Sequence, residues 1–174
     1  MVTSSKTKSG LNIEKLAVCL FRAIYEPEMF SGLVYKPTTN KATIIMFASG
    51  KITSTGCSSI KESINSINNT IFEIEEKLGT EIELEKINTE NIVSISNVNA
   101  RINLKKFNRY YPQTKYDQKV FPGAIYPIFQ RIKALVFTSG KIVLVGSKSE
   151  DETKFAFEKI TDINLLPDRS HFSK

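Results

Sequence analysis

The chain has 174 residues, of which 41% are hydrophobic and 24% are charged, and its formal net charge is +6. No run of residues approaches the roughly 18 apolar positions of a membrane-spanning helix, and the N-terminus lacks the apolar region of a signal peptide. Two isolated cysteines, Cys19 and Cys57, favour a reducing compartment, and a single histidine, His171, leaves no metal-binding spacing.

Charge is distributed unevenly along the chain. Residues 1–79 hold 9 Lys and Arg against 7 Asp and Glu, residues 80–90 hold 1 against 4, and residues 91–174 hold 14 against 7. The pattern divides the chain into a nearly neutral first part, an acidic connector and a basic second part. The basic part favours an anionic partner.

The first part is expected to contain two helices with three short strands between them. Apolar residues at three- and four-residue spacing predict a helix over about Asn12–Ala23, continued by Ile24, with Asn12 as its N-cap. Turn residues then bound strands at 32–36, 42–47 and 51–56. A capping box at Ser59–Glu62 opens a second helix with one apolar stripe, and Gly79 ends this helix.

The second part is expected to follow the same plan. A strand at Asn91–Val98 precedes a helix near Ile102–Tyr110, which Pro112 ends. Three strands follow at 123–126, 133–137 and 141–146, and a capping box at Ser149–Glu152 opens the last helix. The hairpins are too short for parallel crossovers, so the order predicts an α+β fold with antiparallel strands.

A stretch of about thirty residues occurs twice. Four residues recur 91 positions later, namely Tyr25, Phe30, Gly32 and Tyr35, and five recur 90 positions later, namely Phe47, Ser49, Gly50, Lys51 and Gly56. The change of offset places one deletion between two strands. The chain is therefore an internal duplication, with a first repeat at 1–79, a connector at 80–90 and a second repeat at 91–174, forming one intimate domain.

The strands are apolar on both faces. Ile44 and Met46 alternate with Ile45 and Phe47, and the same pattern occurs in the second repeat. The helices can cover only one face of a two-layer fold, so the other face must be buried by a partner or bind a ligand. A dimer partner is one explanation for that second face.

Cations and hydroxyls at the edge of this second face favour another explanation. Ser49 and Lys51 are in register with Phe47, and Ser139 and Lys141 occupy the equivalent positions of the second repeat. An apolar floor edged with hydroxyls and cations suits the minor groove of a nucleic acid, where partly apolar sugars and base edges lie between rims of phosphate.

At these residues the sequence resembles the TATA-box-binding protein family, from about Val2 to Ile163. The marks are the paired motifs FSGLVY and FPGAIY, the paired motifs FASGK and FTSGK, and NIVS at Asn91–Ser94. The resemblance implies a saddle-shaped, ten-stranded curved antiparallel sheet of two pseudo-symmetric direct repeats, with four helices on the convex face. It implies a general transcription initiation factor that binds A·T-rich promoter DNA and nucleates the pre-initiation complex, with no cofactor and no enzymatic activity.

The resemblance also implies the roles of particular residues. Two phenylalanine pairs would wedge into base steps: Phe30 with Phe47, and Phe121 with Phe137. The expected contacts with base edges and the groove floor are Val2, Ile45, Thr53, Thr55, Pro122, Asn91, Val93, Leu135, Val143 and Val145. The expected phosphate contacts are Lys36, Lys41, Ser49, Lys51, Arg131, Ser139 and Lys141.

The chain departs from the family's pattern near the centre of the site. The first repeat has no counterpart of Asn91, because the chain begins one residue too late, and Val145 stands where Thr55 would predict a hydroxyl. Pro127 replaces the cation that the first repeat has at Lys36. We therefore expect looser discrimination at the centre of the DNA element, with the wedges intact.

The resemblance assigns a partner-binding loop, or stirrup, to Asp117, Gln118 and Lys119. Lys119 stands where the family usually has an acid, so we expect a divergent partner resembling transcription factor IIB. Factors similar to transcription factor IIA, the RNA polymerase machinery, and a weak homodimer formed through the concave face without DNA are further expectations.

Two alternatives use the same fold for another purpose. One is recognition of an RNA–DNA hybrid or of damaged DNA, and the other is a scaffold for protein interactions. The expected compartment is the nucleus, or a viral factory in the cytoplasm or a virion if the source is viral. The many Lys, Asn and Ile residues indicate an A·T-rich coding genome, as in a protist or a large DNA virus.

Overall fold

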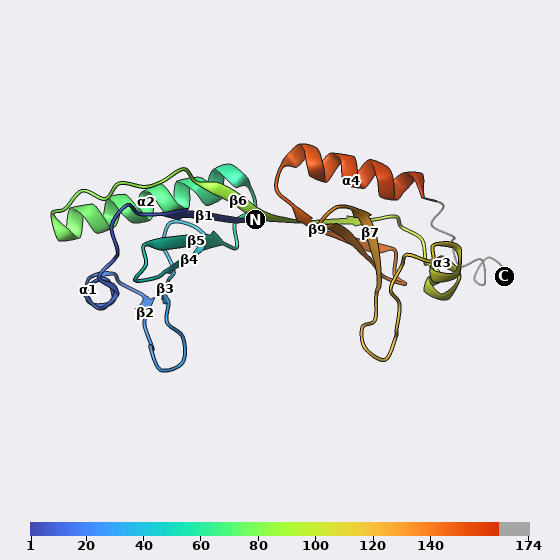
Figure 1. Cartoon of the computed structure of the whole chain (residues 1–174), viewed down its shortest axis with the longest axis horizontal. Helices are drawn as coiled ribbons and strands as arrows, with labels where there is room; N and C mark the ends of the chain where they lie inside the picture. Colours follow the sequence, from blue (N-terminus) through green and yellow to red (C-terminus); the bar gives the residue numbers. More distant parts are fainter. Residues whose placement is uncertain (164–174) are drawn as a thin grey trace. The chain divides into compact units, whose positions relative to one another are not determined.

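The computed structural model in Figure 1 describes residues 1–163. The chain divides into two compact units, Met1–Glu90 and the residues from Asn91 onward. His171 lies outside the described residues. Within the described part, the helices are too short or too polar to cross a membrane.

The first unit contains five antiparallel strands and two helices. The strands are β1 (Val2–Lys6), β2 (Ala23–Ile24), β3 (Leu33–Tyr35), β4 (Thr43–Met46) and β5 (Lys51–Thr55), in the order β2-β3-β4-β5-β1. The helices are α1 (Ile13–Cys19) and α2 (Ile60–Leu78). Strand β1 was not predicted, because its hydroxyl-rich sequence VTSSK has no apolar alternation.

Helix α2 begins and ends as its sequence predicts. The Ser59 side chain accepts a hydrogen bond from the backbone N–H of Glu62, and Gly79 ends the helix with φ of 63°. The Glu62 carboxylate accepts from the N–H of Ser58, so the reciprocal bond forms one residue before the N-cap. Ile67, Ile71 and Ile74 of the predicted apolar stripe are buried in the core of the first unit.

The predicted extent of the first helix is wrong. Helix α1 ends at Cys19, and Arg22 has φ of 68°, a conformation that a right-handed helix cannot include. Ile24 lies in strand β2, pairs with Val34 and is 56% exposed. Strand pairing with β3 satisfies the backbone of this segment, although its apolar spacing continues that of the helix.

The connector lies against strand β1 within the first unit. Thr7 and Leu84 form an antiparallel bridge, and the N–H of Glu85 donates to the carbonyl of Lys6 at 2.7 Å. The side chains of Lys8 and Glu83 form an exposed ion pair. Residues 80–90 are therefore an extended, hydrogen-bonded segment.

The second unit repeats the arrangement with four strands. They are β6 (Asn88–Asn97), which begins three residues before the unit, β7 (Ala124–Phe129), β8 (Ile132–Val136) and β9 (Lys141–Ser147), in the order β6-β9-β8-β7. The helices are α3 (Leu104–Tyr110) and α4 (Glu150–Asp162). At the position equivalent to β2 there is only an isolated bridge between Lys115 and Ile125, so the described units contain nine strands where the resemblance implied ten.

Strand β7 is longer than predicted. It continues through Pro127 to Phe129, with an irregular register between these two residues. Proline is tolerated there because β7 lies at the edge of its sheet, where the missing N–H is not needed for a ladder. The predicted capping of α4 is present, since Ser149 accepts from the N–H of Glu152.

Candidate nucleic-acid interface

Each sheet has one buried face and one open face. In the first unit Ile44, Met46 and Ile52 are fully buried against the helices, while Ile45 and Thr53 on the opposite face are half-buried. In the second unit Val93 and Ile95 on the open face are 46% and 63% exposed. The predicted second apolar face is therefore present in both units and stays accessible to a ligand.

Two pairs of phenylalanines lie at the ends of these open faces. Phe30 and Phe47 have ring centroids 5.8 Å apart and planes inclined at 73°. Phe121 and Phe137 have the same separation and an angle of 64°. The structure thus brings together both predicted pairs, each with an edge-to-face geometry that favours aromatic contact.

A glycine places the rings in each pair. A Cβ atom added at Gly32 would lie 2.6 Å from Cε1 of Phe30 and 2.9 Å from Cε1 of Phe47. At Gly123 the equivalent distances are 2.8 Å to Phe121 and 3.0 Å to Phe137. The rings lie directly against the glycine backbone, so any larger residue would displace them.

The Ser-Gly-Lys turns hold the second ring of each pair. The N–H of Phe47 donates to Lys51, and the N–H of Gly50 donates to Phe47, both at 2.9 Å. Gly50 has φ of 86°, as a three-residue hairpin loop requires, and the equivalent loop at Gly140 has the same bonds and the same φ. The turns fix an aromatic ring at the end of one strand and an exposed lysine at the start of the next.

The strand register defines which residues form the open face, or floor, of each unit. In the first unit Thr53 pairs with Ser4 and with Ile45, and Thr55 pairs with Val2 and with Thr43. In the second unit Val143 pairs with Ile95 and with Leu135. Strand alternation could have found three residues of the open faces that were missed, namely Val34, Ile95 and Ile125. Ser4 was also missed, because it lies in the unpredicted strand β1.

A further missed residue is Lys133. It lies two positions before Leu135 on the same face of β8, opposite Pro127 on one neighbouring strand and Val145 on the other. Its side chain is exposed. The cation that Pro127 lacks is therefore present on the adjacent strand.

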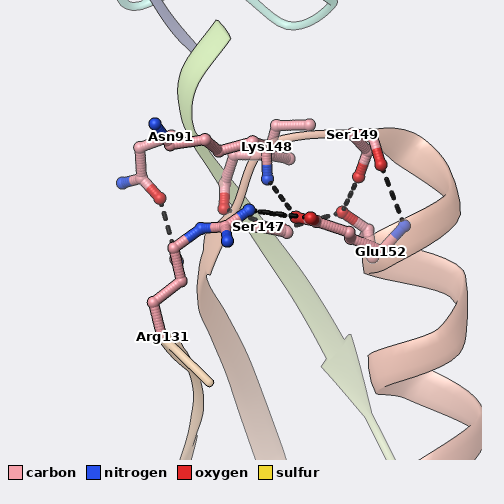
Figure 2. Close-up of polar contacts among 9 residues, drawn as sticks. Asn91, Arg131, Ser147, Lys148, Ser149 and Glu152 are labelled. Atoms are coloured by element: carbon pink, nitrogen blue, oxygen red, sulfur yellow. Dashed lines mark hydrogen bonds and ion pairs between the residues drawn. The ribbon is translucent and has the colours of Figure 1, made fainter. Parts of the chain in front are cut away.

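Asn91 has a defined orientation in the second unit. Its side-chain oxygen accepts a hydrogen bond from the N–H of Gly146 at 2.9 Å (Figure 2). Among the described residues this bond uses the oxygen of the amide, and the amide NH₂ is the group that can donate to a ligand. Donors match the N3 and O2 acceptors that A·T pairs present in the minor groove.

Arg131 is paired within the protein. Its Nη2 lies 2.7 Å from both carboxylate oxygens of Glu152, which also accepts from the N–H of Lys148 at 2.7 Å (Figure 2). The bond from Lys148, and then the guanidinium, hold the pKa of Glu152 below its usual value. A phosphate contact by Arg131 would therefore have to share this guanidinium with Glu152.

The other predicted site residues lie at the surface. The four lysines predicted to contact phosphate are exposed, and so are Ser49, Ser139 and Pro122; the lysines are Lys36, Lys41, Lys51 and Lys141. In the stirrup the carbonyl of Asp117 accepts from the N–H groups of Val120 and Phe121, and the Asp117 side chain accepts from the N–H of Lys119. This turn presents Gln118 and Lys119 to solvent next to Phe121.

Comparisons with known proteins match nearly the whole chain. A family model described as transcription factor TFIID (or TATA-binding protein, TBP) matches residues 1–77 and 86–163. The TATA-box-binding protein of Methanocaldococcus jannaschii is 34% identical over 93% of this chain and 89% of its own length, and that of Tetrahymena thermophila is 31% identical over 92% and 65%. A solved structure of Methanococcus jannaschii TBP superposes with a TM-score of 0.80 at 33% identity, covering 92% of this chain and 93% of that one.

Proposed function

The chain belongs to the TATA-box-binding protein family and is a general transcription initiation factor that binds TATA DNA, and we propose that it does so with the open faces of its two sheets and its two phenylalanine pairs. The family consists of DNA-binding transcription factors rather than enzymes. The α+β fold of two direct repeats that was expected from the sequence of this chain is confirmed.

The two phenylalanine pairs carry this proposal. Phe30 is 44% exposed although it is one of the largest apolar side chains, and each pair is held rigidly by a glycine and a hairpin turn. A rigid apolar wedge can enter a base step, at a cost of a few kcal/mol for unstacking. The bent, widened groove then contacts more of the apolar floor, which offsets that cost.

Preference for A·T pairs follows from the chemistry of the floor. Apolar side chains such as Val143 and Leu135 cannot satisfy the amino group that a G·C pair places in the minor groove. The amide of Asn91 and the hydroxyl of Thr55 would supply the central polar contacts. Because Val145 has no hydroxyl, we propose that substitutions of central base pairs cost no more than the ordinary ~1–3 kcal/mol per pair.

A bending-sensitive energy-transfer assay on TATA and scrambled duplexes tests the wedge mechanism. We expect Phe30→Ala and Phe121→Ala each to reduce bending of the TATA duplex strongly. Phe72→Ala is the matched control, since Phe72 lies on helix α2 and is 61% exposed. Normal bending by the two wedge variants would contradict the proposal, as would an equal loss in the control.

General transcription factors are the partners that the family implies, and the stirrup is the surface we propose for one of them. Lys119 gives it a positive charge where the first repeat has the negative charge of Glu28, so the partner is a factor similar to transcription factor IIB with a complementary surface. Full ternary-complex formation with an ordinary eukaryotic transcription factor IIB, unaffected by Lys119→Glu, would refute this.

Three further proposals concern other partners and the place of action. A factor similar to transcription factor IIA is a second partner. In the absence of DNA the open apolar faces support a weak homodimer, which sedimentation equilibrium over a series of protein concentrations would detect. The protein acts at DNA, and we propose the nucleus as its compartment, with a viral factory as the alternative for a viral source. Imaging of the tagged protein in its host distinguishes these.

A further inference from the structure

The two repeats differ in charge over one equivalent segment. Residues 104–120, which contain α3 and the stirrup, hold five Lys and Arg against one Asp. The equivalent residues 13–29 hold two Lys and Arg against three Glu. All of these charged side chains are exposed, so the difference is a property of the surface. A fold built from a duplication does not need this difference, which points to a ligand of the second repeat alone.

An open pocket lies within this basic segment. It has a volume of about 600 Å³ and is lined by Lys105, Asn108, Arg109, Tyr116, Asp117 and Gln118. Lys105 and Arg109 are four residues apart on α3 and therefore lie on one face of the helix. The pocket is thus formed between a cationic helix face and the base of the stirrup.

Hydrogen-bond acceptors in the pocket indicate which anion fits. Within residues 1–163 the side-chain oxygen Oδ1 of Asn108 is buried and has no hydrogen-bond partner. Asp117 adds a carboxylate to the same lining. A phosphate backbone offers only acceptors, so it would meet the cations but give the Asn108 oxygen no donor, and the Asp117 carboxylate would repel it. An acidic peptide offers carboxylates to the cations and backbone N–H donors to Asn108 and Asp117.

We propose that this pocket binds an acidic peptide segment of a partner protein. Lys105 and Arg109 pair with its carboxylates, and Asn108 accepts from its backbone. Exposed apolar side chains nearby in sequence, Tyr110 at 67% and Val120 at 83%, favour a segment that also carries apolar residues. The inference deepens the proposed function, because it rests on the proposal that a partner factor binds the second stirrup, and it gives the chemistry of that partner.

Three ligands, each fluorescently labelled or used as an unlabelled competitor, test the proposal with the full chain. They are a short end-blocked peptide that alternates Asp or Glu with Leu, its Asn and Gln counterpart, and inorganic polyphosphate. Binding is measured by fluorescence anisotropy without DNA. We expect the acidic peptide to bind, the neutral peptide to bind at least about tenfold more weakly, and polyphosphate to bind through the cations alone.

Residues of the first repeat supply the matched variants, because Glu14, Ala17 and Val18 are the counterparts of the three pocket residues. The double variant Lys105→Glu with Arg109→Val should weaken acidic-peptide binding at least about tenfold. Asn108→Ala should weaken it about fivefold and leave polyphosphate binding unchanged.

The control and the bending assay separate this inference from the DNA-binding proposal. Lys154→Glu on α4 changes an equivalent exposed charge of the same unit and should leave peptide binding within about twofold. Equal binding of the acidic and neutral peptides would overturn the inference. Peptide binding that Asn108→Ala leaves unchanged would also overturn it, because the surface would then attract any anion through its cations alone. Both pocket variants should bend TATA DNA normally, so failure of the wedge mechanism and failure of the peptide site give different results.

Discussion

Exchanging one residue between the two repeats tests how the second sheet contacts DNA. Lys133 lies on the open face of β8, between Pro127 and Val145, and its first-repeat counterpart is Thr43. In Lys133→Thr the second repeat loses its added cation, and in Thr43→Lys the first repeat gains one. Both side chains lie on the open face of their sheet, where Lys133 is exposed and Thr43 is half-buried, so we expect both variants to fold.

The size of the effect follows from counting phosphate contacts. The salt dependence of DNA binding has a slope of about −0.9 for each phosphate that a cation neutralises. The sequence predicts five cations that contact phosphate, and Lys133 adds a sixth. The slope of the logarithm of the binding constant against the logarithm of the salt concentration should therefore be about −5.4 rather than about −4.5. Lys133→Thr should reduce the slope by about 0.9, which lowers the loss of affinity between 50 and 200 mM salt by about 3.5-fold.

The assay is fluorescence anisotropy of a labelled TATA duplex over a series of potassium chloride concentrations. Thr43→Lys should increase the slope by a similar amount, and Lys154→Thr on α4 is the control that should leave it unchanged. An unchanged slope in Lys133→Thr would refute the placement of this lysine at the DNA surface. A smaller total slope for the unmodified protein would indicate that Arg131 stays bound to Glu152 in the complex.

Three further variants have defined outcomes. Gly32→Ala places a Cβ 2.6 Å from Phe30, so the ring must move and bending of TATA DNA should fall in the energy-transfer assay; normal bending would show that the glycine does not place the wedge. Burial and a 2.6 Å hydrogen bond to Glu73 raise the pKa of Tyr35 above its ordinary 10.0. The unfolding free energy should therefore fall as pH rises above about 10, and it should fall less in Tyr35→Phe. Chemical denaturation at each pH measures both. The pKa of Glu152 is lowered, so its contribution to folding stability is present at neutral pH and is lost as pH falls through its folded pKa. The unfolding free energy should therefore fall less with acidification in Glu152→Gln. Identical curves would contradict a stabilising role for this carboxylate.

Local rules predicted most of the fold because the chain repeats its own signals. Helix α2 has a serine N-cap, a regular apolar stripe and a terminal glycine, and all three act as expected in the structure. The phenylalanine pairs were predicted from motifs that occur twice at a constant offset. A pattern seen twice in one chain reduces the chance that either occurrence is accidental.

Long-range pairing explains what the sequence could not predict. The end of α1 depends on β2 pairing with β3, a contact that its own apolar spacing does not encode. The ion pair of Arg131 joins residues 21 positions apart, from the start of β8 to the start of α4. Lys133 was missed because its importance arises from its neighbours on two other strands. Such contacts appear only when strand register is known.

The two units differ in one pair of facing residues on their open faces, and this difference has a consequence for the direction of transcription. Threonines face each other at Thr43 and Thr55 in the first unit, whereas Lys133 faces Val145 in the second. A promoter element read by such unequal halves has two bound orientations that differ in free energy, even when its own sequence is nearly palindromic. We therefore expect the protein to bind the promoter preferentially in one orientation before any other transcription factor binds.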